Sequence, residues 1–197
     1  MANFKDYLFN QSQITTIVVD QNLGNFLWIA YTAVDGECLL QKVSASDLTQ
    51  VFFSVYLPVT SINSIKILGT FLYAAVTHAT IAVYKISVTT PLTSQTTYTK
   101  STLGITESPI AITTSATVVY FLTPGIISGE EAKLVLFTSG SYDETVDLIE
   151  SAILIDNAVS LTVDSNEDIW IVTSDDPTKL YRVFFTTGWE IEETTLS

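Results

Sequence analysis

The chain has 197 residues, 47% of them hydrophobic, with one cysteine, one histidine and a formal net charge of −13. This length suits one substantial core or one array of small repeats, and the acidic balance argues against nucleic acid as a partner, because phosphate binding needs a basic surface. A single cysteine excludes an internal disulfide and zinc sites built from several cysteines.

The N-terminal segment lacks the basic and apolar regions of a secretory signal, and the sequence contains no run of about 18 apolar residues. We therefore expect a protein that is not exported by a signal peptide, does not enter a membrane, and works in the host-cell cytoplasm or in a virion. Residues 1–11 contain Phe4, Tyr7 and Phe9. We interpret this segment as an arm that contacts another protein, or as a latch strand that joins the last repeat.

The first repeat, about residues 12–58, contains four predicted strands. Ile14–Asp20 alternates apolar and polar residues and ends in a turn-forming stretch with Gly24 and Asn25. The strands Leu27–Ala30, Cys38–Val43 and Val51–Leu57 follow. Alternation with a period of two, separated by Gly, Asn and Asp, indicates antiparallel hairpins with one buried face.

Three further repeats follow the same order, at about residues 59–105, 106–155 and 156–197. Their predicted strands are Ile62–Leu68, Leu72–Ala75, Ile81–Val88 and Thr96–Lys100; Pro109–Thr113, Val119–Leu122, Ala132–Phe137 and Thr145–Ile149; and Val159–Asp164, Ile169–Val172, Lys179–Phe185 and Trp189–Glu193. The last strand of each repeat is more polar, which fits an outer edge. No segment shows helical periodicity, so we expect little or no helix.

The second strand of each repeat carries an aromatic residue, at Trp28, Tyr73, Tyr120 and Trp170, with spacings of 45, 47 and 50 residues. A period in this range indicates stacked supersecondary units. We therefore predict an all-β fold, with one domain over residues 12–197 made of four repeats of a four-stranded antiparallel sheet, arranged like propeller blades.

The segment from Ile14 to Ala30, in which a strand ends in Asp, turns through Gly and Asn, and resumes as an apolar-Trp-apolar strand, resembles the repeat of β-propeller sensor domains and NHL-type propellers. Residues 161–172 are similar. The middle repeats have lost parts of this pattern. The resemblance implies a propeller architecture and no particular activity, since propellers include enzymes, receptors and scaffolds.

Two turns have oxygen-bearing side chains at alternate positions, as calcium loops do: Asp20 with Asn22, and Asp164 with Asn166 and Asp168. The glycine and glutamate that such a loop needs at its sixth and twelfth positions are absent after Asp164. We expect these side chains to cap turns by accepting backbone N–H groups, and we predict no metal and no cofactor.

Other candidates for chemistry are sparse. His78 is the only histidine, so we expect a loop or surface residue rather than a catalytic base. Cys38 begins an apolar strand and is expected to be a buried, inert thiol. Carboxylates that could flank a sugar are Asp143, Glu144, Asp164 and Asp168. They lie in polar, turn-like segments with nothing to raise their pKa values, so we predict no enzymatic activity.

Charge and aromatic residues point to protein partners. Residues 1–106 hold five acids and five lysines, whereas residues 107–197 hold 16 acids and three cations. Either the acidic half is a solvated surface, or the neutral half is covered by a partner. Tyr56 and Trp189, in outer strands, are candidate interaction residues together with Phe4, Tyr7 and Phe9.

From these features we predict a non-catalytic structural or protein-interaction module, bound to other subunits as a homo- or hetero-oligomer. A bacteriophage virion, with this chain as a head, neck or tail protein, is the assembly that its general character favours. The alternatives are a carbohydrate- or ligand-binding propeller and, second, a glycan-processing enzyme.

Overall fold

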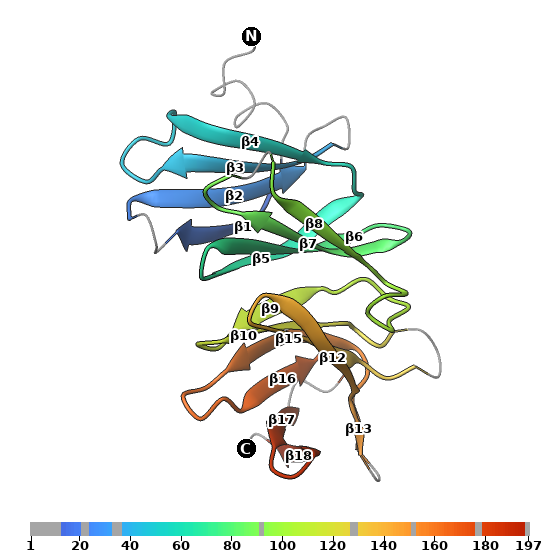
Figure 1. Ribbon diagram of the computed structural model, residues 1–197. Helices are drawn as coiled ribbons and strands as arrows, with labels where there is room; N and C mark the ends of the chain where they lie inside the picture. Colours follow the sequence, from blue (N-terminus) through green and yellow to red (C-terminus); the bar gives the residue numbers. More distant parts are fainter. Residues whose placement is uncertain are drawn as a thin grey trace. The chain divides into compact units, whose positions relative to one another are not determined.

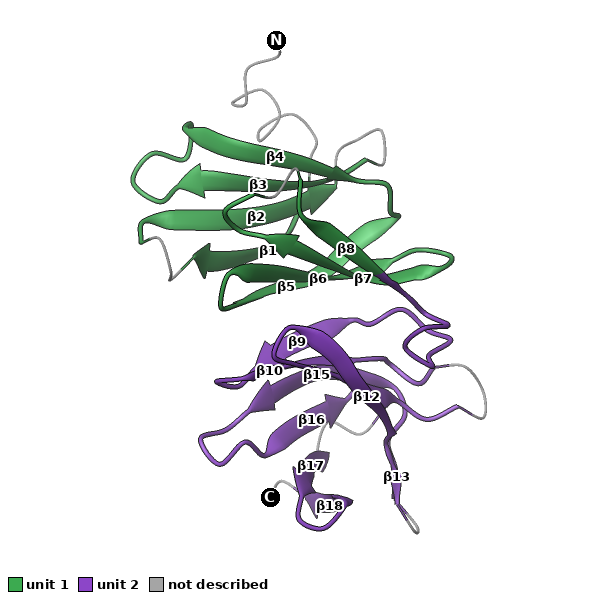
Figure 2. Cartoon of the chain, viewed as in Figure 1, with its two compact units in different colours: residues 1–97 green, residues 98–197 purple. Residues whose placement is uncertain are grey.

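The computed structural model describes residues 13–20, 24–32, 37–90, 93–126, 130–150, 153–175 and 179–195. These residues form strands and connecting turns, with no helix among them. The chain divides into two compact units, residues 1–97 and 98–197 (Figure 2). Each unit contains two four-stranded antiparallel sheets whose strands follow chain order (Figure 1).

Sheet 1 and sheet 2 belong to the first unit. Sheet 1 consists of β1 (Gln13–Asp20), β2 (Phe26–Thr32), β3 (Cys38–Ser44) and β4 (Val51–Leu57). Sheet 2 consists of β5 (Ser61–Leu68), β6 (Phe71–Thr77), β7 (Ile81–Ser87) and β8 (Gln95–Thr99), which reaches the unit boundary. The β5–β6 hairpin turns at Gly69, whose φ of 57° is a conformation that costs glycine least.

Sheet 3 and sheet 4 form the second unit. Sheet 3 consists of β9 (Ala111–Thr114), β10 (Val118–Leu122), β11 (Lys133–Thr138) and β12 (Ser141–Asp147). A small hairpin of β13 (Ile149–Glu150) and β14 (Ile153–Leu154) leads to sheet 4, which consists of β15 (Ala158–Val163), β16 (Ile169–Thr173), β17 (Lys179–Phe185) and β18 (Trp189–Thr195).

Each unit has an apolar core between its two sheets. In the first unit, Trp28 and Leu40 of sheet 1 pack in one cluster with Leu72 and Ile86 of sheet 2. In the second unit, side chains of β10 and β11 pack in the same way with side chains of β16 and β17. Alternate residues of the inner strands therefore fill an inter-sheet core, and this burial holds the sheets of a unit together.

The first strands of three sheets share a bulge near their beginning. The pairing register shifts between Ile14 and Thr16 in β1, between Ile62 and Ser64 in β5, and between Ala158 and Ser160 in β15. An extra residue at this position bends a strand and increases its twist. The repeats are thus alike in a backbone irregularity that their side chains do not reveal.

The predicted all-β fold and its four four-stranded antiparallel sheets are confirmed. One local prediction was wrong, and one small element was missed. The fourth strand of the third repeat begins at Ser141 rather than Thr145, because Ser139 and Gly140 (φ of 52° and 84°) form a tight turn after β11. The β13–β14 hairpin was not predicted. The single domain over residues 12–197 stays a prediction, and the arm at residues 1–11 lies outside the described residues.

Candidate interaction surface

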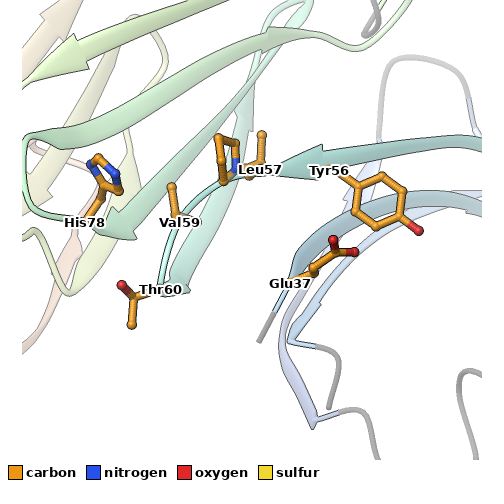
Figure 3. A pocket seen from close by; sticks show the side chains of 7 residues that line it. Glu37, Tyr56, Leu57, Val59, Thr60 and His78 are labelled. Atoms are coloured by element: carbon orange, nitrogen blue, oxygen red, sulfur yellow. The ribbon is translucent and has the colours of Figure 1, made fainter. Parts of the chain in front are cut away.

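A groove of about 660 Å³ opens in the first unit, where the chain passes from sheet 1 to sheet 2. It is lined by Glu37, Tyr56, Leu57, Pro58, Val59, Thr60 and His78. These residues precede β3, end β4, link β4 to β5, and follow β6. Figure 3 shows Tyr56 and Glu37 on one side of the groove and His78 on the other.

The base of the groove has a fixed backbone. The Val59 N–H donates to the Leu57 carbonyl over 2.8 Å, and the Thr60 N–H donates to the Thr77 carbonyl over 2.8 Å. The Leu57 and Val59 side chains are buried in the core between the sheets. Pro58 adds a further constraint, because its ring locks φ. The groove is therefore held in shape by the fold and needs little ordering to accept a ligand.

His78 closes the turn between β6 and β7. Its Nδ1 accepts the backbone N–H groups of Thr80, at 3.2 Å, and Ile81, at 3.0 Å. In the neutral ring the proton is then on Nε2, which leaves one donor for the groove. The expectation of a loop histidine is confirmed, although its place in a groove was not foreseen.

Tyr56 gives the groove an accessible aromatic ring. It lies on β4, an edge strand of sheet 1, and 56% of it is exposed. The exposed Glu37 adds a carboxylate to the same side. Tyr56 was predicted as an interaction residue, whereas Glu37 was not, since nothing in the sequence places residue 37 near residue 56. Phe4, Tyr7 and Phe9 lie outside the described residues.

Trp189, the other predicted interaction residue, is half-buried in the second unit. Its indole N–H donates to a Glu144 carboxylate oxygen over 2.9 Å, and its ring meets the Phe185 ring edge to face, with centroids 5.4 Å apart. The indole also packs against the core of the unit. Trp189 thus joins sheet 4 to sheet 3, and Phe185 is the more accessible ring of the pair.

The two turns that resemble calcium loops differ in structure. Asp164 caps its turn as expected: one oxygen accepts the N–H groups of Asn166 and Asp168, at 2.8 and 3.1 Å. The other accepts the Trp170 indole N–H at 3.0 Å, and this bond is the main reason why the pKa of Asp164 is lowered. A carboxyl group with a lowered pKa is a poor general acid.

Asp20 does not cap its turn with the described backbone groups but lies buried between the sheets. One oxygen accepts from Lys42 Nζ at 2.9 Å and from the Trp28 indole N–H at 3.3 Å. Lys42 also donates to the carbonyl of Val88, the residue that follows β7 of sheet 2, over 3.4 Å. The aspartate is therefore part of a buried ion pair that joins two sheets, which is a structural role.

The other residues singled out from the sequence have local partners. Asp143 accepts the Thr138 hydroxyl at 2.9 Å, and Asp168 accepts the Arg182 guanidinium at 2.6 and 2.9 Å. Cys38 is buried, as expected. In the described part of the chain, no three His, Cys, Asp or Glu side chains gather to hold a metal ion. The same residues contain no helix long and apolar enough to cross a membrane.

Comparison with known proteins identifies the architecture. The sequence matches no protein-family model and no curated protein. Solved structures do match. The Pan2 WD40 domain of Neurospora crassa has a TM-score of 0.59 and 9% identity over 96% of this chain and 52% of its own. The chain has a β-propeller fold.

Two further structures agree. A luciferin-regenerating enzyme matches with a TM-score of 0.59 and 9% identity, over 93% of this chain and 63% of its own. YCF48 bound to D1 peptide matches with a TM-score of 0.54 and 12% identity, over 93% of this chain and 53% of the YCF48 chain. The chain therefore spans between about half and three-fifths of the length of these propellers. At such low identity the likeness concerns the fold alone.

Proposed function

We propose that this protein is a non-catalytic protein-interaction module that binds an extended peptide segment of a partner in the Tyr56 groove. The observation that carries the proposal is the exposed Tyr56 ring beside a preformed groove with an apolar base. Tyrosine is enriched among the residues that dominate interface energies, because its rigid ring buries a large area at a small entropic cost.

The size and the polar groups of the groove support a peptide ligand. Its volume of about 660 Å³ lies within the range of about 300 to 1,000 Å³ that is usual for ligand sites. Thr60 and His78 provide polar side chains for the backbone groups of a peptide, and Glu37 provides a negative charge. Together with the net charge of −13, this carboxylate favours a basic segment. That YCF48 was solved with a bound D1 peptide is consistent with the proposal at the level of fold.

Peptide selection tests this proposal directly, because it does not require a known partner. A phage-displayed library of random peptides is panned on the immobilised protein, and enriched peptides are titrated by fluorescence anisotropy. We expect basic peptides with an apolar residue, and Tyr56→Ala to weaken their binding at least about tenfold. Glu37→Gln should weaken binding and reduce its salt dependence.

The matched control is Phe185→Ala, which truncates another exposed aromatic ring outside the groove. Binding to this variant should stay within about twofold of that to the unmodified protein, well below the change at a hot spot. The proposal fails if no peptide is enriched, or if the enriched peptides bind the Tyr56→Ala protein equally well. A glycan array probed in parallel tests the carbohydrate-binding alternative.

A finer proposal places the module in a larger assembly such as a bacteriophage virion. It rests on the acidic, Ser- and Thr-rich character of the sequence, and no contact among the described residues bears on it. The genes beside the coding sequence provide the test. Flanking capsid or tail genes would support a virion component, whereas a neighbouring sensor kinase or transport gene would contradict it.

A further inference from the structure

The four sheets repeat one side-chain arrangement on one of their faces. The aromatic residue of the second strand lies directly opposite a residue of the third strand, and this residue is a cation in three sheets. The pairs are Trp28 with Lys42, Tyr73 with Lys85, Tyr120 with Leu136, and Trp170 with Arg182. We call the face that carries the aromatic residue the following face of its sheet, and the opposite one the preceding face.

Within each unit, the following face of one sheet is covered by the preceding face of the next. Trp28 and Lys42 on the following face of sheet 1 are buried against sheet 2. The Lys42 ammonium donates to the carbonyl of Val88, which follows β7. Tyr120 on the following face of sheet 3 is buried against sheet 4. The chain thus contains two examples of the same face-to-face contact.

The following face of sheet 4 is built in the same way but is only half covered. The Trp170 indole N–H donates to Asp164 over 3.0 Å, as Trp28 donates to Asp20 over 3.3 Å. The Arg182 side chain, in the place of Lys42, remains 33% exposed. Trp170, Val172 and Leu180 on this face have intermediate exposure, whereas Trp28 is buried.

The preceding face of sheet 1 is likewise uncovered along β1, where apolar side chains are exposed. Ile17 pairs with the second strand as Ile65 does in sheet 2 and Leu161 does in sheet 4. Ile17 is 52% exposed, whereas Ile65 is 1% and Leu161 is 8% exposed. Val19, two residues further on the same face, is exposed as well. Ile65 and Leu161 are thus buried where a preceding sheet packs against them. The same face of sheet 1 is already buried on β2 and β3, at Ile29, Tyr31, Leu39 and Val43, so the exposed strip is confined to β1.

We propose that the occupant of both faces is a second copy of this chain. In this head-to-tail contact, β1 of one copy covers Trp170 and Arg182 of the other, as sheet 2 covers Trp28 and Lys42 within one chain. Two copies joined through both pairs of faces hold eight sheets, within the roughly four to eight of known propellers. The matched propellers are also between about one and a half times and twice as long as this chain.

The proposed contact and the peptide groove lie at opposite edges of the same face of sheet 1, because Ile17 is in register with Ile29, and Tyr56 is in register with Leu39 and Tyr31. β1 and β4 are the two edge strands of sheet 1, so Ile17 and Tyr56 are separated by three strand spacings, or about 14 Å. Tyr56→Ala should therefore leave self-association unchanged, and substitutions on β1 should leave peptide binding unchanged. Failure of one proposal can then be distinguished from failure of the other.

Light scattering at increasing concentration is the first test. We expect the mass to approach twice the chain mass of 21.6 kDa. Ile17→Lys should raise the dissociation constant of the pair at least about tenfold. The matched control is Ile149→Lys, because Ile149 is also 52% exposed but lies in the β13–β14 hairpin. A chain that stays monomeric at about 100 μM, or equal effects of the two substitutions, would overturn the proposal.

Cross-linking between two variants shows which faces meet. Val19→Cys and Val172→Cys proteins are mixed and treated with a short bismaleimide, and Cys38 remains in place because it is buried. We expect a product of twice the chain mass from the mixture, with little from either variant alone. A double variant that carries both cysteines, Val19→Cys and Val172→Cys, is treated in the same way. If it cross-links only within one chain and the mixture yields no product, the two faces meet within one molecule and the second copy is excluded.

Discussion

The buried ion pair of the first unit gives the strongest prediction about stability. Lys42→Met removes the ammonium group that lies 2.9 Å from the Asp20 carboxylate, while the Trp28 N–H remains as a donor to that oxygen. Both members of the pair are almost fully buried. Removal of one partner leaves an uncompensated buried charge, which costs about 3 to 5 kcal/mol.

This loss of unfolding free energy can be measured by urea unfolding, monitored by circular dichroism and tryptophan fluorescence. With a slope of about 2 kcal/mol per M, a loss of 4 kcal/mol shifts the midpoint down by about 2 M. The double variant Asp20→Leu with Lys42→Met should be at least about 2 kcal/mol more stable than Lys42→Met alone, because no charge is then left buried. The loss of the Trp28 acceptor limits this recovery by about 1 kcal/mol.

Lys133→Met is the matched control. Lys133 pairs with Asp147 at 2.6 Å, but the Asp147 side chain is well exposed to water. An exposed pair of this kind contributes about 0 to 1 kcal/mol. The reasoning is refuted if Lys42→Met costs less than about 1 kcal/mol, or if the effects at Asp20 and Lys42 are simply additive.

Two further predictions concern single contacts. Gly125→Ala should destabilise the second unit by about 2 to 5 kcal/mol in thermal unfolding, since a Cβ there would lie 2.3 Å from the Ala132 nitrogen. Gly104→Ala, at the same φ of 65° but in open space, should cost only about 1 to 2 kcal/mol. Trp170→Phe should raise the pKa of Asp164 towards its ordinary value of 3.8, as measured by NMR titration. A lowered pKa stabilises the fold above about pH 4. The stability difference between this variant and the unmodified protein should therefore be present at pH 7 and shrink as the pH falls below 3.8. A difference that grows in acid would contradict this prediction.

Local sequence was sufficient to determine the strands, many of the turns and the number of sheets. Ile65 and Ile67 alternate with polar residues, and this pattern by itself gives a strand with one buried face. Gly69 marks the turn because its positive φ is strained for other residues. The spacing of the four aromatic residues then gave the repeat. These features depend on neighbours along the chain, so they can be read from one sequence.

Tertiary structure decided the surroundings of each repeated position. Asp20 and Asp164 stand at equivalent points of two similar repeats, yet Asp20 is buried with Lys42 while Asp164 caps its own turn. Ile17 and Ile65 follow the same alternation and differ in exposure by half of their surface. The groove likewise joins residues from positions 37, 56–60 and 78. The reason is physical: alternation fixes which face a side chain is on, and only the packing of sheets decides whether that face meets another sheet or water.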